Sequence, residues 1–214
     1  MKRILNYIYP LTKTIASQYS GLLEITWDNG KKHLNSKNAN YSYGSLQRIL
    51  KFGLEKINLS KVNSILVLGM GGGSVIETLR QDFNYCKQID AVEIDPIIIA
   101  LAHTEFGISE SEFLKIHCMD AFKFIRTNKK KFDVIIVDLY IDLTVPDKFL
   151  NLDFWDNVIK SKSSKGTIIF NASVKDLKHE TIKTLTDYIK TKIFKVETHE
   201  KVNNTNTVII ASGL

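Results

Sequence analysis

The stretch SILVLGMGGGSVIETL, Ser64–Leu79, decides the fold, because four of the five residues 69–73 are glycines between an apolar run and a helix-like run. Glycine loses more backbone freedom on folding than any other residue, so a chain keeps it where the backbone must be bare or turn sharply. A packed turn needs about one or two glycines. Four of them predict that something bulky lies close against the main chain, at a strand–turn–helix unit.

Strand and helix patterns alternate from Lys61 onward. Apolar runs predict strands at residues 65–68, 89–93, 114–118, 132–137 and 167–170. Helical patterns occupy residues 74–81, 96–106, 121–127, about 150–160 and 176–190. Strands that bury both faces and alternate with helices predict a parallel sheet covered on two sides.

The end of the chain breaks this rhythm. Two strand patterns, IFKVETH (193–199) and NTVIIAS (206–212), are separated only by EKVNNT (200–205). Such a connection is too short for a parallel crossover, so the last strand must run antiparallel. The expected fold is a doubly wound, Rossmann-like α/β sheet of seven strands with an antiparallel C-terminal hairpin, as in class I S-adenosylmethionine-dependent methyltransferases.

The first forty residues have a different pattern. LLEITWDNGKKHLN alternates apolar and polar residues on both sides of Asp28-Asn29-Gly30, which is typical of a β-hairpin. Apolar residues at helical spacing follow from Leu46 to Ile57, with Ser45 as the expected cap. We therefore expect a small N-terminal β-hairpin appendage at 1–40, a connecting helix at 41–60 and the main domain at 61–214.

Local signals fix several helix ends. Asp95 is a typical N-cap, Pro96 fits the first helical position and Gly107 fits the far end. Asp120 is placed to cap the helix DAFKFIRT.

Composition sets outer limits on function. The 214 residues contain no run of 18 apolar residues, and the short apolar run near the start has no small-residue cleavage site, so we expect a cytoplasmic protein without a membrane span or a cleavable leader. Cys86 and Cys118 lie in or beside expected core strands and suggest no disulfide framework. The five histidines share no metal-ligand spacing, and we assign no metal; they are His33, His103, His117, His179 and His199.

Lysine supplies most of the net charge of +6, mainly in NKKKF (128–132) and KSKSSKG (160–166). Both runs lie where turns are expected, and neither interleaves aromatic residues for base stacking. They are interpreted as solvated loops, so nucleic-acid binding is not favoured.

Acidic residues follow three of the expected strands. Glu93 ends the second strand, twenty residues after Gly73, where a carboxylate can accept both ribose hydroxyls of a nucleotide. Asp120 follows the third strand and Asp138 ends the fourth. Because ligands bind beyond the carboxyl ends of such strands, the three acids predict a nucleoside site. Each acid also has a structural interpretation as a helix cap or as an acceptor for loop amides.

Four motifs carry a family resemblance: ILVLGMGGGSVIETL, AVEIDPIIIALA, HCMDAFKFI and KFDVIIVDLY. In this order and spacing they resemble the spermidine synthase family of aminopropyltransferases, over most of residues 41–140. The hairpin and the YSYGSLQRIL helix also fit that family's layout. The resemblance implies a homodimer and, as cofactor, S-adenosylmethionine or decarboxylated S-adenosylmethionine.

The resemblance also assigns residues to the site. It implies that Glu93 holds ribose, that Asp120 holds adenine with Ala121 as a further cofactor-binding residue, and that Asp138 stands at the catalytic gate. Tyr41 and Tyr43 are expected near the pocket mouth. The bare turn against the cofactor consists of Gly69, Gly71, Gly72 and Gly73.

Two departures from the family pattern bear on the reaction. Gly72 replaces an aspartate that grips the amino end of the decarboxylated cofactor. In the gate DLYIDLTVP (138–146), Asp142 comes one residue late. A polyamine is a polycation and needs several carboxylates to bind it, so these departures weaken the case for polyamine transfer. An aspartate at position 72 would repel the carboxylate of intact S-adenosylmethionine, and Gly72 removes that repulsion. Methyl transfer is therefore slightly favoured, with Asp138 or Asp142 as base or amine anchor and Tyr140 shaping the acceptor pocket.

Other interpretations stay open. One is aminopropyl transfer to putrescine, and another is a non-catalytic nucleoside- or partner-binding protein of the same fold. A nicotinamide-dependent dehydrogenase is disfavoured by Ser74, by Asp120 and by the terminal hairpin. The expected partner is a small-molecule acceptor, with amines among the candidates.

Overall fold

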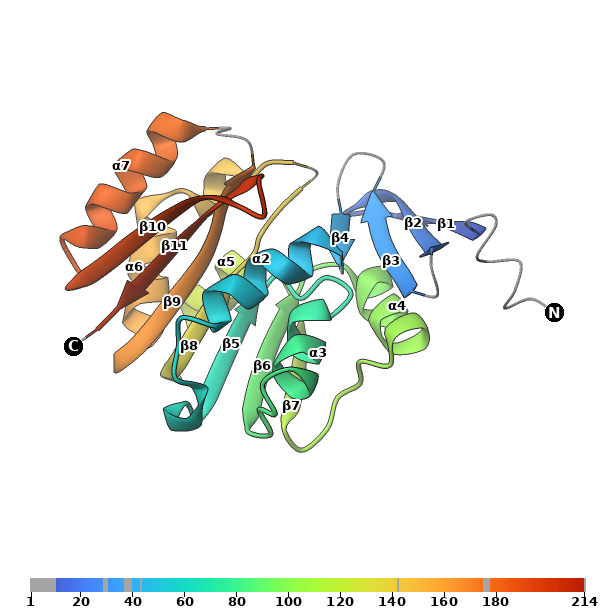
Figure 1. Cartoon of the computed structure of the whole chain (residues 1–214), viewed down its shortest axis with the longest axis horizontal. Helices are drawn as coiled ribbons and strands as arrows, with labels where there is room; N and C mark the ends of the chain where they lie inside the picture. Colours follow the sequence, from blue (N-terminus) through green and yellow to red (C-terminus); the bar gives the residue numbers. More distant parts are fainter. Residues whose placement is uncertain are drawn as a thin grey trace.

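Two β-sheets organise the molecule, and the smaller one lies at one end of the larger (Figure 1). The computed structural model describes residues 11–28, 31–36, 40–42, 44–141, 143–174 and 178–213. The small sheet is antiparallel and consists of β1 (Leu11–Ser17), β2 (Gly21–Asp28), β3 (Lys31–Ser36) and β4 (Asn40–Ser42). The predicted hairpin is β2–β3, and the structure adds a strand on each side of it; the expected Asn29-Gly30 turn lies outside the described residues.

The large sheet has the strand order β10-β11-β9-β8-β5-β6-β7. Its members are β5 (Ser64–Leu68), β6 (Gln88–Glu93), β7 (Leu114–Cys118), β8 (Phe132–Val137), β9 (Lys162–Val174), β10 (Lys195–Val202) and β11 (Asn206–Ser212). Strands β5 to β9 are parallel, and β11 runs antiparallel between β9 and β10. The predicted seven-stranded doubly wound sheet with its antiparallel hairpin is confirmed.

Helices cover both faces of the large sheet (Figure 1). They are α2 (Ser45–Leu54), α3 (Ser74–Gln81), α4 (Pro96–Phe106), α5 (Ala121–Thr127), α6 (Leu152–Ser161) and α7 (His179–Lys190), with short 3-10 helices η1 (Leu59–Lys61) and η2 (Asp147–Phe149). Ile65 and Val67 pack in the core under α2, α3 and α4, whereas Leu66 and Leu68 pack in the core under α5, α6 and α7. Successive side chains of β5 thus fill opposite layers, as a fully buried strand requires.

Two of the three predicted helix N-caps, Asp95 and Asp120, are confirmed, and so is the predicted helix end at Gly107. The Asp95 carboxylate accepts from the Ile97 N–H at 2.9 Å, and Gly107 ends α4 with φ 71°. Asp120 accepts from the Lys123 N–H at 3.1 Å and begins α5. The prediction of Ser45 as a cap is wrong, because Ser45 is already helical and Gly44 precedes it with φ 62°.

One further expectation needs correction. The run KSKSSKG is not a loop, because Lys162–Gly166 belongs to β9, where Lys162 pairs with Phe132 of β8. Cys118 ends β7 and Cys86 precedes β6, as expected, and both are exposed. Helix α6 matches the helix expected at about 150–160, and the expected start of α7 at Asp176 lies outside the described residues. Among the helices that the structure describes, none has the length and apolar character needed to cross a bilayer.

The small sheet is attached to helix α4 and to its N-cap, Asp95. The hydroxyls of Ser17 and Ser20 both donate to the Asp95 carboxylate, the latter at 2.7 Å. Apolar residues of β2 and β3 pack against Ile98 and Leu101 of α4. These contacts bring the β1–β2 turn to the carboxyl ends of the parallel strands.

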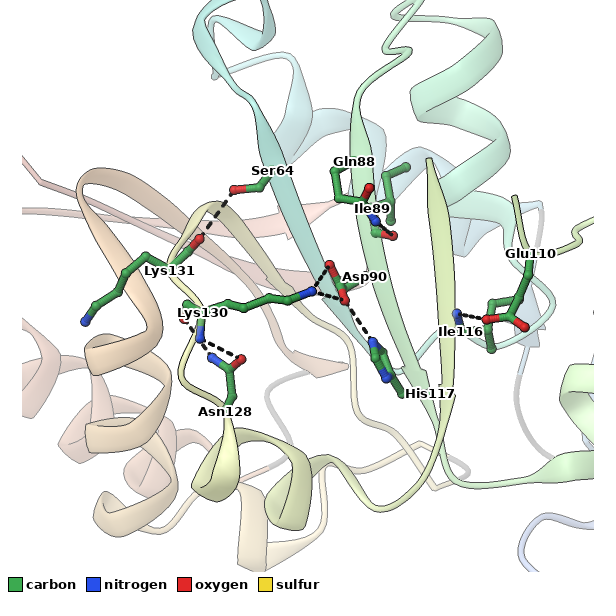
Figure 2. A network of polar contacts seen from close by, with 10 residues as sticks. All are labelled: Ser64, Gln88, Ile89, Asp90, Glu110, Ile116, His117, Asn128, Lys130 and Lys131. Carbon is green, nitrogen blue, oxygen red and sulfur yellow. Dashed lines mark hydrogen bonds and ion pairs between the residues drawn. The ribbon is translucent and has the colours of Figure 1, made fainter. Parts of the chain in front are cut away.

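A buried carboxylate, Asp90, lies in the middle of β6. Asp90 is only 1% exposed and contacts His117 Nε2 at 2.8 Å and Lys130 Nζ at 3.1 Å. Figure 2 shows the side chains of His117, from β7, and Lys130, from the loop before β8, both pointing toward Asp90. Through these contacts Asp90 links β6 to β7 and to the loop before β8, which are the segments on either side of α5 in the chain.

Removing both partners of Asp90 is expected to destabilise the protein more than removing Asp90 itself. The variant His117→Leu/Lys130→Met leaves a buried unpaired carboxylate, at an expected cost of about 3–5 kcal/mol. Asp90→Asn leaves two side chains that are 31% and 56% exposed and can be hydrated instead. Urea unfolding at pH 7 measures both; a double variant as stable as Asp90→Asn would contradict the pairing.

Candidate nucleoside-binding site

A cavity of about 600 Å³ opens at the carboxyl ends of β5, β6, β7 and β8. This position is the switch point of the sheet, because β5 lies between β6 and β8. The volume suits a ligand of nucleoside size. Glu93, Asp120 and Asp138, the three acids singled out from the sequence, all line it.

The glycine turn forms one wall of the cavity through Gly69 and Gly71, whereas Gly72 and Gly73 are not part of the lining. A Cβ on Gly73 would come within 2.6 Å of the Ile108 side chain. The missing side chain therefore lets the glycine turn pack against Ile108, just after the end of α4. A Cβ on Gly69 would come within 2.0 Å of the Asp138 carbonyl oxygen. Two of the four glycines, Gly69 and Gly73, are therefore explained by close packing within the protein, although the sequence alone suggested a bulky ligand.

Glu93 is held by main-chain donors at the turn. Its Oε2 accepts from the Gly71 N–H at 3.0 Å, and its Oε1 accepts from the Asp95 N–H at 3.1 Å. Burial raises the pKa of Glu93 above its usual range, and the two N–H donors oppose that rise. A carboxylate has about four lone-pair sites, so acceptor capacity remains on the side that faces the cavity.

Asp120 combines a structural and a cavity-facing role. Its Oδ1 caps α5, and its Oδ2 accepts from Lys148 Nζ at 2.6 Å. Burial acts to raise the pKa of Asp120, but the Lys148 ammonium and the Lys123 N–H outweigh it and hold the pKa below its usual range. Ala121 lines the cavity as the first residue of α5.

Asp138 begins a chain of polar contacts on the other side of the cavity. Asn171 Nδ2 donates to its carboxylate at 2.9 Å, and Asn171 Oδ1 accepts from Asn206 Nδ2 at 2.8 Å. The Tyr140 hydroxyl also donates to Asn171 Oδ1, at 3.4 Å. Burial raises the pKa of Asp138 to about 6, while the Asn171 hydrogen bond opposes the rise. Burial, with the nearby Asp138 charge, raises the pKa of Tyr140, so its hydroxyl stays protonated.

The structure adds lining residues that sequence reasoning missed. They are Tyr19 and Ser20 of the β1–β2 turn, Leu46 and Ile49 of α2, Lys148 and Phe149 of η2, and Asn171, Thr205 and Asn206 near the ends of β9 and β11. Asn171 was detectable, because it is a lone amide inside the apolar run TIIFNAS at the end of an expected strand. Lys148 carried no comparable signal.

Three residues that were expected at or near the site cannot be placed. Asp142 and Tyr43 lie outside the described residues, as does the side chain of Tyr41. Within the described ranges, His, Cys, Asp and Glu residues form no group of three or more that could hold a metal ion.

Two curated relatives match part of the chain. An eEF1A lysine and N-terminal methyltransferase of Danio rerio is 28% identical over 144 residues, 60% of this chain and 21% of the relative. A polyamine aminopropyltransferase of Vibrio vulnificus (strain CMCP6) is 29% identical over 114 residues, 52% of this chain and 38% of the relative. The chain thus spans well under half the length of either relative.

Two solved structures share the fold. A probable spermidine synthase from Corynebacterium glutamicum ATCC 13032 has a TM-score of 0.80 at 17% identity, covering 95% of this chain and 81% of that one. Human methyltransferase-like protein 13, in complex with SAH, has a TM-score of 0.68 at 24% identity, covering 80% and 83%. Both likenesses concern the architecture.

A cavity at the switch point of a doubly wound sheet with an antiparallel terminal hairpin defines a protein of the methyltransferase-like fold class. More narrowly, residues 47–205 match the Spermine/spermidine synthase domain. The match covers more than half of the chain, so this protein belongs to the spermine/spermidine synthase family. The resemblance carried by the four sequence motifs is confirmed, while the homodimer that it implies stays a prediction.

Proposed function

We propose that this protein is a transferase that binds S-adenosylmethionine, or decarboxylated S-adenosylmethionine, and passes an alkyl group to a small acceptor. One observation carries the proposal. Acids from the ends of three strands, Glu93, Asp120 and Asp138, converge on one cavity that is walled by bare glycine backbone. Names of family relatives support it, since the two matched above are a methyltransferase and an aminopropyltransferase.

The lining residues fit an adenosine group. Glu93 would accept from the ribose hydroxyls, and Gly71 would let the ligand approach the main chain, since it lacks a side chain. Asp120 would accept from the adenine amino group through a lone pair left free by Lys148 and Lys123. Apolar side chains of Ile94 and Met119 line the same cavity and would flank the base.

The acceptor side supplies a base. Asp138, with its pKa at about 6, is mostly ionised near neutral pH and can take the proton that the acceptor loses when it attacks the alkyl carbon. The carbon–sulfur bond breaks and its electron pair stays on sulfur. Asn171 holds the Asp138 carboxylate in place, and the protonated Tyr140 hydroxyl is available to orient the acceptor.

Methyl transfer is the reaction that we favour. No side chain stands at Gly72 to repel the carboxylate of intact S-adenosylmethionine. Aminopropyl transfer to putrescine is the alternative, favoured by the family's name and by the aminopropyltransferase relative. The two differ in product: incubation with each donor and a panel of amines releases S-adenosylhomocysteine in the first case and methylthioadenosine in the second. Release of neither product, across donors and acceptors, would favour the non-catalytic alternative.

Donor binding is tested at Glu93. We expect Glu93→Gln to weaken S-adenosylhomocysteine and methylthioadenosine binding by about ten- to hundredfold, because a charged acceptor of the ribose hydroxyls is lost. Isothermal titration calorimetry measures the affinity, and thermal unfolding is recorded in parallel.

Asp95→Asn is the matched control, because Asp95 caps α4 two residues after Glu93 but does not line the cavity. Its binding should stay within about threefold of wild type. Equal affinity of wild type and Glu93→Gln for both ligands would rule out the ribose role.

A further inference from the structure

Asn206 is a buried residue that lines the cavity at the start of β11, and the proposed chemistry gives it no role. Its Nδ2 donates to Asn171 Oδ1 at 2.8 Å, and its amide also hydrogen-bonds the Tyr140 hydroxyl. The Tyr140 hydroxyl in turn donates to Asn171 Oδ1 at 3.4 Å. Asn206 therefore contacts both of the residues that the proposed function places around Asp138.

The Asn206 contact fixes which end of the Asn171 amide faces Asp138. Asn171 is fully buried, and its Oδ1 is met by two donors, Asn206 Nδ2 and the Tyr140 hydroxyl. Its Nδ2 is thereby directed to the Asp138 carboxylate, at 2.9 Å. Half a turn of the Asn171 amide would set its oxygen against that carboxylate and its Nδ2 against the Nδ2 of Asn206. Two acceptors and two donors would then face each other, which is unfavourable.

The orientation of the Asn171 amide is coupled to the proton on Asp138. An ionised carboxylate can only accept, so it requires Nδ2, whereas a protonated carboxyl can donate its O–H to the rotated oxygen. A donor that faces the carboxylate favours the ionised form, and this hydrogen bond opposes the rise in the pKa of Asp138 that burial causes. Without the donor at Asn206 the Asn171 amide could rotate, and Asp138 would hold its proton more tightly.

The other titratable groups of the described lining leave Asn171 as the group in direct contact with the Asp138 carboxylate. Tyr140 stays protonated, because burial and the Asp138 charge raise its pKa. Glu93 accepts from main-chain N–H groups, and Asp120 and Lys148 pair with each other. Asp142 lies outside the described residues, so the titration must be read at Asp138 itself. The titratable residues that line the cavity with Asp138 are Tyr19, Glu93, Asp120, Tyr140 and Lys148.

We propose that Asn206 is a positioning residue that acts on Asp138 through Asn171: it holds the Asn171 amide with Nδ2 toward Asp138 and so keeps the base ionised and in place. The inference rests on the proposed transferase function, in which Asp138 takes a proton from the acceptor. The effect of Asn206 on the reaction passes through the proton of Asp138. It should therefore show in the pH dependence of the protein and not in donor binding.

The variant Asn206→Leu keeps a side chain of similar shape and removes its donors. The carboxyl carbon-13 resonance of Asp138, assigned as the signal that Asp138→Asn lacks, is titrated from about pH 4 to about pH 9. We expect a midpoint at about 6 in wild type. The midpoint in Asn206→Leu should be about one pH unit higher, because a hydrogen bond to a charged group is worth about tenfold in proton affinity. Asn206→Val, which is smaller and suits a strand, should shift in the same direction.

Thr207→Val is the matched control on the same strand. Thr207 follows Asn206 on β11, is also buried and does not line the cavity, so its variant should keep the wild-type midpoint. Asn171→Leu should raise the midpoint at least as far as Asn206→Leu does. Adding Asn206→Leu to Asn171→Leu should raise it little further, because the two residues act in series.

Three outcomes overturn the inference. One is an unchanged midpoint in Asn206→Leu or Asn206→Val, and another is an equal shift in Thr207→Val. The third is a double variant in which the shifts of Asn206→Leu and Asn171→Leu add, because Asn206 would then not act through Asn171.

Donor binding and turnover are read separately. Asn206→Leu should bind S-adenosylhomocysteine within about threefold of wild type, and its turnover should fall by about fivefold at pH 6 and approach wild type at about pH 8.5. A carboxyl titration that moves while the turnover profile does not would refute Asp138 as the base. Wild type that releases no product would refute the proposed function, and the carbon-13 titration would still decide whether Asn206 controls Asp138.

Discussion

Replacing Asp138 by asparagine is expected to lower turnover by about 10²–10⁴-fold, because the substitution removes the proposed base. Binding of S-adenosylhomocysteine should stay within about threefold of wild type, since the proposed function assigns Asp138 to the acceptor and not to the donor. The Asn171 hydrogen bond can persist, because the new amide also offers an oxygen to Asn171 Nδ2. Turnover is measured as product release in assays with a single donor, and S-adenosylhomocysteine affinity is measured by calorimetry.

Wild-type activity should follow the titration of Asp138. Burial raises the pKa of this carboxyl to about 6, and a base works only when it is deprotonated. Turnover at saturating donor is therefore expected to rise with pH through about 6 and to level off above about 7. A rate that falls with rising pH across this window would contradict the assignment.

Stability should move in the opposite direction to activity. The folded-state pKa of Asp138 lies above the ordinary carboxyl value, so the folded state binds the proton more tightly than the unfolded chain does. The ionised carboxylate thus costs stability, and the cost develops between about pH 4 and pH 6. Asp138→Asn lacks this charge, so at pH 8 it should exceed wild type by on the order of 3 kcal/mol in unfolding free energy, with the difference vanishing below about pH 4.

Asp133→Asn is the matched control on the same strand. Asp133 accepts from the Asn63 N–H and the Ser163 hydroxyl, both at 2.9 Å, at the end of β8 that is remote from the cavity. Its variant should lose stability and keep activity. Loss of both properties in Asp138→Asn at pH 8 would assign Asp138 a structural role.

The parts of the fold that sequence predicts are those specified by near neighbours. Strand β5, the glycine turn and α3 follow one another directly, and Asp95, Pro96 and Gly107 mark the ends of α4 from within thirteen residues of each other. The parts that escape prediction depend on distant partners. Lys162–Gly166 is polar and resembles a loop, yet pairing with β8 makes it strand. β1 becomes a strand because β2 offers it an edge.

The site shows the same division. The three acids Glu93, Asp120 and Asp138 are predictable, because each lies at or just after the end of a parallel strand. Parallel strands end at the same edge of the sheet, so the three residues meet at one cavity. The partners of these acids are not. Lys148 lies 28 residues from Asp120 and Asn171 lies 33 residues from Asp138, and no local pattern links such pairs. The charge balance of the cavity is therefore a property of the fold.

Gly69→Ala is expected to be the most destabilising single substitution in the glycine turn. An added Cβ would lie 2.0 Å from the Asp138 carbonyl oxygen and 2.9 Å from its carbon, both main-chain atoms that cannot rotate away. Gly69 also has φ +89°, which an L side chain rarely adopts. Relief would require β5 and β8 to separate.

That separation breaks the hydrogen bond between the two strand ends, in which the Asp138 N–H donates to the Leu68 carbonyl at 2.9 Å. On its other side the turn is held to β6, because the Gly69 and Met70 N–H groups both donate to the Val92 carbonyl at 3.0 Å. We expect a loss above about 4 kcal/mol in urea unfolding, or failure to obtain folded protein. Any folded fraction should bind S-adenosylhomocysteine weakly, because the turn and Asp138 move together.

Gly107→Ala separates the steric contribution from the conformational one. Gly107 has φ +71° and open space around its missing Cβ, so only the backbone penalty of about 1–2 kcal/mol should appear. The difference between the two variants measures how tightly the turn is packed against the end of β8. If Gly69→Ala cost no more than Gly107→Ala, the close approach of these two strand ends would be wrong, and with it the geometry that brings Asp138 to the glycine wall.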